Sequence, residues 1–521
     1  MIEIIRLIIG AGILLLLFST AMGSTYYVAP YGNDKNDGSV GTPWKSVTKG
    51  FKSAKPGDTV YFREGIYRQE RTIESWYFSH KATKDARITF KSYPGETAVI
   101  TCMKLRDDPS DWHRVGDTKI YWTQLSKQYL KLAKVQRIPH CSEDGIPLKL
   151  MTRPDENGGP NDLVGPGQWA RSVLDMKLYM WSTDGKNPGT HQTEFCEFVY
   201  GGSNTIDMQH NPLSDEEEAD YLTFEGLIIE GGYYPIVIGT DYIELKNCTF
   251  RNCFSNGIKV WGARPADYNN PDDSSHTNYF NSENGLIEDC NIYAFTDSGI
   301  DITGGDYWIV RRNKIHDGAI NYPYVSRPLN GIMLKNNSIG TLVEGNKIYK
   351  LSPGTGITIG GISWIRGGIA DEAADITVRN NEIYELSDGP YIILFQAAKN
   401  CGFYNNLIRD CNVAGAIIQM NSGNAAEPRH SNRDCKIKGN TFYNNRAHLG
   451  PGGWMHVLYY ERVKGCVLNL ESDYNTFHNF PEMTFYFGGS NKTFEEFRSL
   501  GYDVHSRTEA PPGAKNLLKG K

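Results

Sequence analysis

The sequence has little of what marks several large protein classes. Net charge is only -6 at pH 7 and no block of basic residues occurs, so the clustered Lys and Arg that grip nucleic acid are missing. The apolar run at 7–18 is short for a transmembrane helix and no other stretch could cross a bilayer, which excludes a polytopic membrane protein. Ten cysteines in 521 residues are too few for a disulfide scaffold, and no Cys/His spacing predicts a zinc site.

Glycine is abundant, and its abundance favours an all-β fold. The chain contains 54 Gly and 24 Pro without collagen periodicity, which indicates many turns between short strands. Because hydrophobic residues make up 40% and charged residues 22%, intrinsic disorder is excluded. A length of 521 residues fits either several ordinary domains or one long repeat, and we expect an all-β chain.

The amino terminus has the pattern of an export signal. Arg6 precedes the apolar run at 7–18, and small residues around Gly23 predict cleavage before Ser24. We therefore expect a signal peptide at 1–23, a secreted protein and no membrane association beyond export, with a retained anchor as the alternative. In an exported protein cysteines can pair, and Cys401 and Cys435 each lie five residues before an Asn of the repeat motif described below, Asn406 and Asn440. Their pairing between adjacent coils and two free thiols both remain open.

A short motif, in which Asn or a neighbouring residue precedes x-Ile or x-Phe, recurs eight times from Asn247 onward. The intervals between its copies range from 23 to 42 residues, and the shortest fit one coil of a right-handed parallel β-helix, the longer ones a coil with an insertion. Asn suits this column because it tolerates a left-handed backbone and its amides can stack between coils. The second residues of the motifs are Cys248, Cys290, Asn313, Asn346, Asn381, Asn406, Asn440 and Asn475.

A second marker follows the first: a glycine, which we expect to turn the coil, and then an alternating strand. Four such strands begin at Gly257, Gly299, Gly331 and Gly356. Alternation sends their Ile, Val and Leu inward and the residues between them outward to solvent. The first outward column is Lys259, Asp301, Met333 and Thr358, and the second is Trp261, Thr303, Lys335 and Gly360. Since stacked strands lie about 4.8 Å apart, we expect Lys259, Asp301 and Lys335 to meet on one face.

The insertions at 262–284, 317–329, 361–374 and 422–433 all adjoin the ends of these strands, so we expect them to wall a groove along that face. Aromatic side chains stack on sugars and guanidinium groups hold carboxylates. The candidate substrate-binding residues are Trp261, His276, Tyr322, Tyr324, Arg327, Trp364 and Arg366.

Two flanking segments carry resemblances. The segment from Tyr26 to Tyr67, with Asn36-Asp37-Gly38 and Lys55-Pro56-Gly57-Asp58, resembles the amino-terminal cap of secreted pectate-lyase-like β-helix proteins. This resemblance implies a short helix at about 44–54 that closes the open end of the β-helix. The segment at 110–205 looks like the small β-sandwich inserted in some β-helix glycoside hydrolases. We therefore expect five regions: signal peptide 1–23, cap and first coils 24–109, inserted module 110–205, β-helix 206–490 and carboxy-terminal cap 491–521.

A local match concerns the chemistry. Asp297-Ser298-Gly299-Ile300-Asp301, followed by Asn330-Gly331-Ile332-Met333-Leu334-Lys335, resembles the Asp cluster and later Asn-Gly-x-Lys strand of polysaccharide lyase family nine. The resemblance implies Ca²⁺ at Asp297 and Asp301 and a lysine base. This sequence departs from that pattern, because Met333 stands at the expected Lys position. We therefore expect the base to be Lys335 or, failing that, Lys259.

Three functions follow from this reading. The favoured one is β-elimination of a uronate polysaccharide by a monomeric secreted enzyme, in which Lys335 or Lys259 is the base, Asp301 takes part in catalysis, and Arg327 or Arg366 steadies the substrate carboxylate. The second is glycoside hydrolysis, which needs two carboxyl groups. The third is binding of carbohydrate without cleavage. For hydrolysis, Asp301 could pair with Asp297, Asp306, Asp371 or Glu372.

Overall fold

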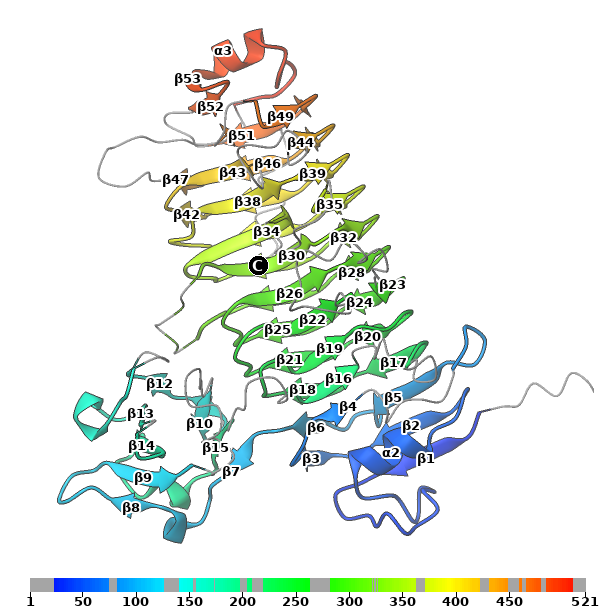
Figure 1. Ribbon diagram of the computed structural model, residues 1–521, viewed down its shortest axis with the longest axis vertical. Helices are drawn as coiled ribbons and strands as arrows, with labels where there is room; N and C mark the ends of the chain where they lie inside the picture. The colour runs from blue at the N-terminus through cyan, green and yellow to red at the C-terminus, as the bar shows by residue number, and fades with distance from the viewer. Residues whose placement is uncertain are drawn as a thin grey trace, which may run out of the picture.

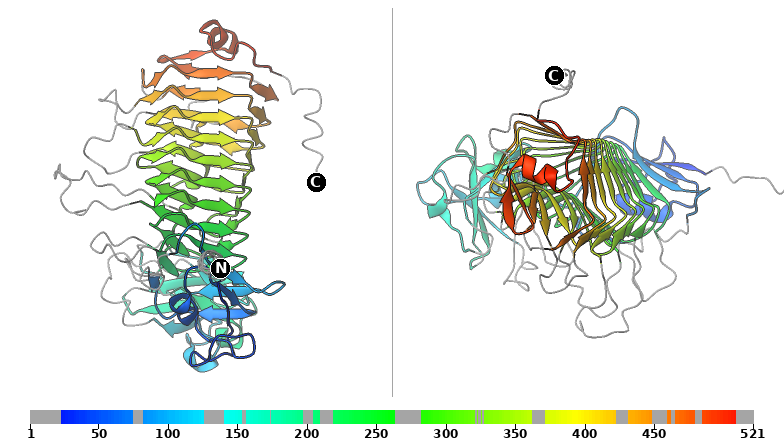
Figure 2. Two further views of the ribbon diagram at one scale, coloured as in Figure 1. Left: turned by 90° about the vertical axis from the view of Figure 1, so that its right-hand side faces the viewer. Right: turned by 90° about the horizontal axis from the view of Figure 1, so that it is seen from above.

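The chain forms a right-handed parallel β-helix, as the sequence predicts, with one module projecting from its amino-terminal part (Figures 1 and 2). The computed structural model describes residues 23–74, 82–125, 140–152, 156–172, 174–196, 204–208, 219–262, 282–320, 322, 325, 327–361, 371–421, 431–447, 459–461, 465–478 and 484–508. Three long sheets run along the stack, and each coil contributes one strand to each sheet.

Sheet A and sheet B are parallel throughout. Sheet A contains β1 (Thr25–Val28), β2 (Thr59–Phe62), β5 (Ile88–Ser92), β17 (Leu222–Glu225), β20 (Glu244–Lys246), β24 (Leu286–Glu288), β28 (Ile309–Arg311), β32 (Leu342–Glu344), β36 (Thr377–Arg379), β40 (Gly402–Tyr404), β45 (Lys436–Lys438) and β50 (Glu471–Asp473). Sheet B contains β3 (Gly65–Arg68), β6 (Ala98–Thr101), β18 (Ile228–Glu230), β21 (Thr249–Arg251), β25 (Asn291–Tyr293), β29 (Lys314–His316), β33 (Lys347–Tyr349), β37 (Glu382–Tyr384), β41 (Leu407–Arg409), β46 (Thr441–Tyr443) and β51 (Thr476–His478).

Sheet C carries the strands that the sequence singled out, and it is parallel up to its final antiparallel pair. It contains β4 (Ile73–Glu74), β16 (Ile206–Met208), β19 (Ile236–Ile238), β22 (Ile258–Trp261), β26 (Ser298–Thr303), β30 (Leu329–Lys335), β34 (Gly354–Gly360), β38 (Tyr391–Gln396), β43 (Ala416–Asn421), β48 (Tyr459–Glu461), β52 (Phe485–Phe487) and β53 (Ser490–Lys492). Short lateral ladders join the coil corners: β23 (Ser282–Glu283) with β27 (Gly305–Asp306), β42 (Asn412–Val413) with β47 (Arg446–Ala447), and β31 (Ser338–Ile339), β35 (Ala373–Ala374), β39 (Ala398–Lys399), β44 (Asn432–Arg433) and β49 (Val467–Leu468).

The recurring motif makes the corner between sheets A and B. Its first residue has a positive φ in all eight copies, from 51° at Asn247 to 72° at Gly439, which explains why Asn, Asp and Gly predominate there. Its second residue points inward, and from Asn313 onward the side-chain amides form a buried ladder. Asn381 shows the pattern, since its Nδ2 donates to Asn406 Oδ1 at 3.0 Å and its Oδ1 accepts from the Asn346 main chain at 2.9 Å. The predicted stacking of amides between coils is confirmed.

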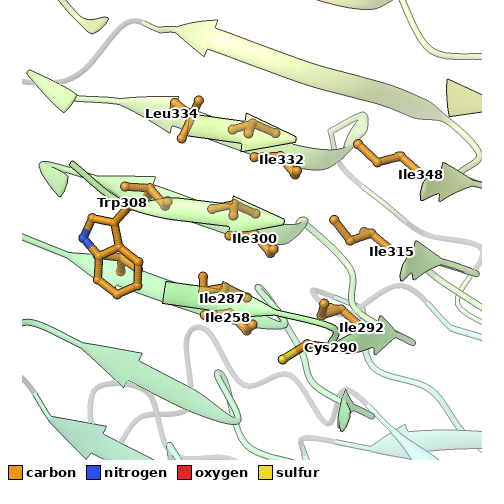
Figure 3. Close-up of a cluster of buried hydrophobic side chains, with 14 of the residues drawn as sticks. Ile258, Ile287, Cys290, Ile292, Ile300, Trp308, Ile315, Ile332, Leu334 and Ile348 are labelled. Atoms are coloured by element: carbon orange, nitrogen blue, oxygen red, sulfur yellow. The ribbon is translucent and has the colours of Figure 1, made fainter. Parts of the chain in front are cut away.

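The interior is a continuous apolar column. The inward-facing Ile, Val and Leu of the four predicted strands are fully buried, as expected, and each contributes about 1.5–3 kcal/mol of hydrophobic free energy. Figure 3 shows Ile258, Ile300 and Ile332 stacked on successive coils. The glycine that precedes each strand does not turn the coil, contrary to our expectation. Gly299 lies within β26, where an added Cβ would come within 2.3 Å of Ile315 Cγ2, so close packing of two sheets selects glycine.

Each end of the stack is covered. The helix expected at about 44–54 is α2 (Val47–Ser53), whose Phe51 ring meets Phe90 at 4.5 Å between centroids and seals the amino-terminal opening. At the other end α3 (Phe494–Ser499) sets Phe497 against Phe485 at 4.4 Å (Figure 1). The ladder of amides also ends here, because Asn475 Nδ2 donates to Asp503 Oδ1 at 2.8 Å.

The inserted module consists of two small, mostly antiparallel sheets (Figure 1, lower left). One contains β7 (Lys104–Leu105), β10 (Cys141–Glu143), β11 (Ile146–Pro147) and β15 (Thr193–Phe195), and the other β8 (His113–Arg114), β9 (Tyr121–Gln124), β12 (Lys149–Leu150), β13 (Gln168–Ser172) and β14 (Lys177–Trp181), with the 3-10 turns Pro109–Asp111, Pro160–Asp162 and Pro188–Thr190. His191 fastens the module, because its ring nitrogens contact Asp144 at 2.8 Å and Asp184 at 3.2 Å. Burial opposes protonation of His191, but these carboxylates and Glu143 raise its pKa.

Several expectations concern the ends of the chain and its thiols. The predicted signal peptide lies outside the described residues, apart from Gly23. Within the described part of the chain, no helix is long and apolar enough to cross a membrane. None of the ten cysteines, all of which lie in described segments, is disulfide-bonded. Cys401 and Cys435 instead donate to main-chain carbonyl groups of neighbouring coils.

Candidate active site

The outer face of sheet C brings the predicted chemical residues together. Strand register places Lys259 beside Asp301 and Asp301 beside Met333, while Thr303 stands next to Lys335 in the second column. The proximity expected from the repeat is therefore confirmed. Asp297 joins the group because it immediately precedes β26, the strand that carries Asp301.

Lys259 is the anchor of this cluster. Its Nζ lies 2.9 Å from Asp301 Oδ2, donates to Thr303 Oγ1 at 2.6 Å and stands 4.8 Å from the centre of the Trp261 ring. A carboxylate, a hydroxyl and an aromatic face thus surround one ammonium group. These contacts replace the water that the buried charge has lost.

Asp301 is the hub on which the polar contacts converge. Its Oδ2 accepts from Asn256 Nδ2 at 3.0 Å, and its Oδ1 accepts from Thr303 Oγ1 at 2.9 Å. Lys335 Nζ approaches the same Oδ2 to 3.7 Å from the following coil. One carboxylate is therefore shared by two lysines on opposite sides of its strand.

The cluster moves the pKa values of its members in different directions. Burial lowers the pKa of Lys259 to about 8; Asp301 works against this and the positive charge of Lys335 adds to it. Burial would raise the pKa of Asp301, but Lys259 and then Lys335 bring it down to about 2. Burial raises the pKa of Asp297, and the negative charge of Asp301 raises it further. The site therefore holds one firmly ionised carboxylate and one that retains its proton to higher pH.

The expectation that both outward columns face water needs correction. Lys259 is 4% exposed, Asp301 5% and Thr358 2%, although all three point away from the apolar core. Neighbours on the same face cover them, such as Trp261 over Lys259 and Asn330, whose Oδ1 accepts from Thr358 Oγ1 at 2.9 Å. The Lys335 side chain is the more open lysine, with 27% of its surface exposed.

The described residues do not fit the Ca²⁺ site that the sequence resemblance implies. Calcium takes six to eight oxygen ligands, whereas this cluster offers two carboxyl groups, and Asp301 already holds the Lys259 ammonium at 2.9 Å. No group of three His, Cys, Asp or Glu suited to a metal occurs within the described segments. A divalent cation beside Asp301 would meet the positive charge of Lys259 and Lys335, so we derive no step through calcium.

The other carboxylates weighed for hydrolysis are engaged elsewhere. Asp306 Oδ1 accepts from the Ile339 main chain at 2.9 Å, and Glu372 Oε2 accepts from the Asn336 main chain at 2.9 Å. Asp371 forms an ion pair with Arg433. Asp297 with Asp301 is therefore the carboxyl pair that the cluster itself provides.

The predicted substrate-binding residues lie in different environments, and several lie outside the described residues. Trp261 lies in the cluster, over Lys259, and Arg327 is exposed. Tyr322 is only 6% exposed and packs with Phe254 into the apolar cluster of the inserted module, so it is a packing residue and no stacking surface for a sugar. His276, Tyr324, Trp364 and Arg366 lie outside the described residues, as do most of the insertions expected to wall a groove.

The sequence interpretation gave no role to two polar residues of the site. Asn256 binds Asp301 directly, and Asn330 occupies the matching position two coils later. A signal was present, because both precede the glycine of an Asn-Gly-Ile strand start. Tyr234 is a third neighbour, since the charges of Asp301 and Asp297 add to the effect of burial in raising its pKa. Nothing in its sequence context marks it.

Fold and comparison together define the class of protein. The family described as "Right handed beta helix region" matches residues 196–361, 268–427 and 325–498, which jointly cover more than half of the chain, so the protein belongs to this family. A second family, described as "Pel9A-like, right handed beta helix region", matches residues 26–147. The amino-terminal resemblance inferred from the sequence is thereby confirmed.

Individual relatives are similar over limited segments. The uncharacterized protein YwoF of Bacillus subtilis (strain 168) is 33% identical over 79 residues, which are 15% of this chain and 16% of that protein. Pectate lyase PEL9 of Emericella nidulans is 28% identical over 95 residues, 18% of this chain and 22% of that protein. These matches thus span less than a quarter of either relative. The solved structure of XylC with xylose superposes with a TM-score of 0.60 at 14% identity, covering 88% of this chain and 84% of XylC, and shows a shared fold.

Proposed function

We propose that this protein is a carbohydrate-active enzyme that cleaves a uronate-containing polysaccharide by β-elimination. One observation carries the proposal: the ammonium groups of Lys259 and Lys335 converge on the single buried carboxylate of Asp301, at 2.9 and 3.7 Å. Elimination needs a base for the proton next to the substrate carboxylate and positive charge to stabilise the carbanion that forms. A lysine pair sharing one carboxylate supplies both.

The two lysines take different roles because they differ in exposure. Lys335 is open enough to reach a bound sugar, so it is the base that removes the C5 proton. Lys259 is buried under Trp261 and stays behind Asp301 as a fixed positive charge. The positive charge of Lys335 adds to burial in lowering the pKa of Lys259, and the carboxylate of Asp301 between the two lysines opposes that shift.

The two aspartates complete the reaction. Asp301 is kept ionised by the two lysines and is positioned by its bonds to Asn256 and Thr303, so it holds both ammonium groups in place. Asp297 keeps its proton to higher pH, so it donates to the glycosidic oxygen as the C4–O4 bond breaks. Arg327 lies exposed in an insertion and, with Arg366, is our candidate to hold the substrate carboxylate.

The comparisons support the class of substrate. One matching family is described as Pel9A-like, one relative is named a pectate lyase, and XylC was solved with xylose. These names support a carbohydrate as the substrate. With the predicted signal peptide, this favours an enzyme that acts on polysaccharide outside the cytoplasm. That the enzyme is a monomer stays a prediction from the sequence.

A panel of pectic, alginate and glycosaminoglycan polymers tests the proposal. Cleavage should produce the ultraviolet absorbance of an unsaturated uronate on at least one substrate, and Lys335→Ala should lower kcat by about 10²- to 10⁴-fold. Lys314→Ala, which removes an exposed lysine on β29, is the matched control and should leave the rate unchanged. Parallel assays with Ca²⁺ and with a chelator test the calcium expectation. Cleavage without ultraviolet absorbance would refute the lyase, and no cleavage at all would leave a binding protein.

Glycoside hydrolysis is the second candidate, and one observation favours it. The pKa values of Asp297 and Asp301 are pushed apart, upward in one and down to about 2 in the other, as in an acid and nucleophile pair. New reducing ends without ultraviolet absorbance, abolished by Asp297→Asn, would establish this function in place of elimination.

A further inference from the structure

Two cysteines stand at the neck of the inserted module. Cys102 follows β6, where the chain leaves sheet B, and Cys196 follows β15, the last strand of the module. The two residues are 94 positions apart in the sequence, yet their Sγ atoms lie 3.9 Å from each other. The chain therefore enters and leaves the module through a pair of touching thiols.

The surroundings are built to admit both sulfurs. Gly231 offers no side chain, and a Cβ there would come within 3.0 Å of Cys102 Sγ. The main-chain N–H of Gly232 donates to Cys196 Sγ at 3.2 Å and fixes its position. Disulfide bonds measure about 2.05 Å, so the sulfurs need to approach by about 2 Å.

The pair differs from the chain's other cysteines. Cys248, Cys290 and Cys435, for example, point into the coil and donate to main-chain carbonyl groups, and burial raises the pKa of each. Cys102 is partly exposed, and its contact with the Cys196 thiol outweighs burial and lowers its pKa. A partly exposed thiol with a lowered pKa is the type that attacks an oxidant.

We propose that Cys102 and Cys196 form a disulfide that closes the neck of the inserted module. The oxidant is a small or protein disulfide. The Cys102 thiolate attacks one of its sulfurs and expels a thiol, and the Cys196 thiolate then attacks Cys102 Sγ in the mixed disulfide and expels the second thiol. Two protein S–H bonds become one S–S bond, and the two electrons and two protons leave with the oxidant as two thiols.

The bond would hold the module against the coil that carries the candidate site. The module's apolar cluster includes Phe254 from the β-helix, two residues before Asn256, the donor to Asp301. This inference rests on the cysteine geometry and is independent of the enzymatic proposal.

The test is a peptide map of the full-length folded protein after incubation with oxidised glutathione, alkylation and digestion without reductant. We expect the peptides containing Cys102 and Cys196 to be joined, and the joined species to disappear after treatment with a reductant. Cys102→Ser and Cys196→Ser should each abolish it, and Cys290→Ser, which alters a core thiol, should retain it. Circular dichroism of each variant verifies folding, and the wild-type map alone decides the outcome if a variant fails to fold.

Two results would overturn the inference. One is full alkylation of both cysteines after oxidation of the wild-type protein. The other is a bond from Cys102 to Cys253, a buried thiol whose pKa is raised by burial and further by the charge of Cys102.

Discussion

The buried ammonium of Lys259 makes a prediction about stability and pH. Its pKa falls from 10.5 to about 8 on folding, so between these values the unfolded chain binds more protons and stability rises with pH. The contribution is complete above 10.5 and is lost as pH falls through about 8. The pKa difference corresponds to about 3 kcal/mol, and no discount for solvent screening applies because the side chain is 5% exposed.

The perturbation is Lys259→Met, which keeps a flexible side chain of similar length but cannot titrate. At an unfolding entropy of about 2 cal/mol/K per residue, a chain of this length shifts its Tm by about 1 °C per kcal/mol. As pH rises from 7.5 to 10.5, the difference between the Tm of the wild-type protein and that of the variant should therefore change by about 3 °C in favour of the wild type.

Scanning calorimetry of the two proteins across this pH range measures the difference directly. The tyrosines, the cysteines and the other lysines are present in both proteins, so their effects on Tm cancel in the comparison. Lys314→Met serves as the control, because Lys314 is exposed on β29 and its removal should leave the wild-type slope intact. Parallel Tm curves for wild type and Lys259→Met would show that Lys259 keeps an ordinary pKa, and the reasoning about the site's electrostatics would then be wrong.

Three further predictions follow from contacts described above. Asp301→Asn leaves Lys259 buried without its counter-charge and should lower the free energy of unfolding, measured by calorimetry, by about 3–5 kcal/mol. Combining it with Lys259→Met should recover part of this loss. A double variant no more stable than Asp301→Asn alone would contradict the ion pair. Asn381→Ala breaks the amide ladder and should lower the free energy of unfolding by about 2–5 kcal/mol, since several buried polar partners lose their bonds. The control is Asn380→Gly, at the neighbouring exposed position with positive φ, which should change that free energy by under about 1 kcal/mol. Equal effects of the two substitutions would argue against the ladder. His191 has a raised pKa, so its contribution is present below pH 6.5 and is lost as pH rises through the folded value; limited proteolysis of the module should accelerate over that range in wild type and show no such pH step in His191→Gln.

The sequence was sufficient for the features that repeat. The spacing of the motifs around Asn313 and Asn346 predicted coils, and strand alternation then placed Lys259, Asp301 and Lys335 on one face. Both inferences need only the period of the coil and the two-residue period of a strand.

Features that depend on contacts between distant segments were not predictable in this way. Periodicity tells which face Lys259 is on but not that Trp261 and its other neighbours remove it from water. Tyr322 sits in an insertion rich in aromatics, yet it packs into a module whose core comes from residues far upstream. The same holds for Cys102 and Cys196, whose approach is set by how the module's two ends return to one point. For Gly299 the position was correct and the reason was wrong, since packing rather than backbone conformation requires it.

The way the amide ladder ends has a consequence for the protein's behaviour at high concentration. A stack of parallel coils is open at each end, and an unpaired last coil could accept a strand from another copy. At the carboxy-terminal end the last Asn of the ladder is paired within the chain, because Asp503 Oδ1 accepts from Asn475 Nδ2 and Ser506 Oγ accepts from the Asn475 main-chain N–H. These two residues thus take the place that the next coil's Asn would have in the ladder, and we expect this to disfavour end-to-end association of two stacks.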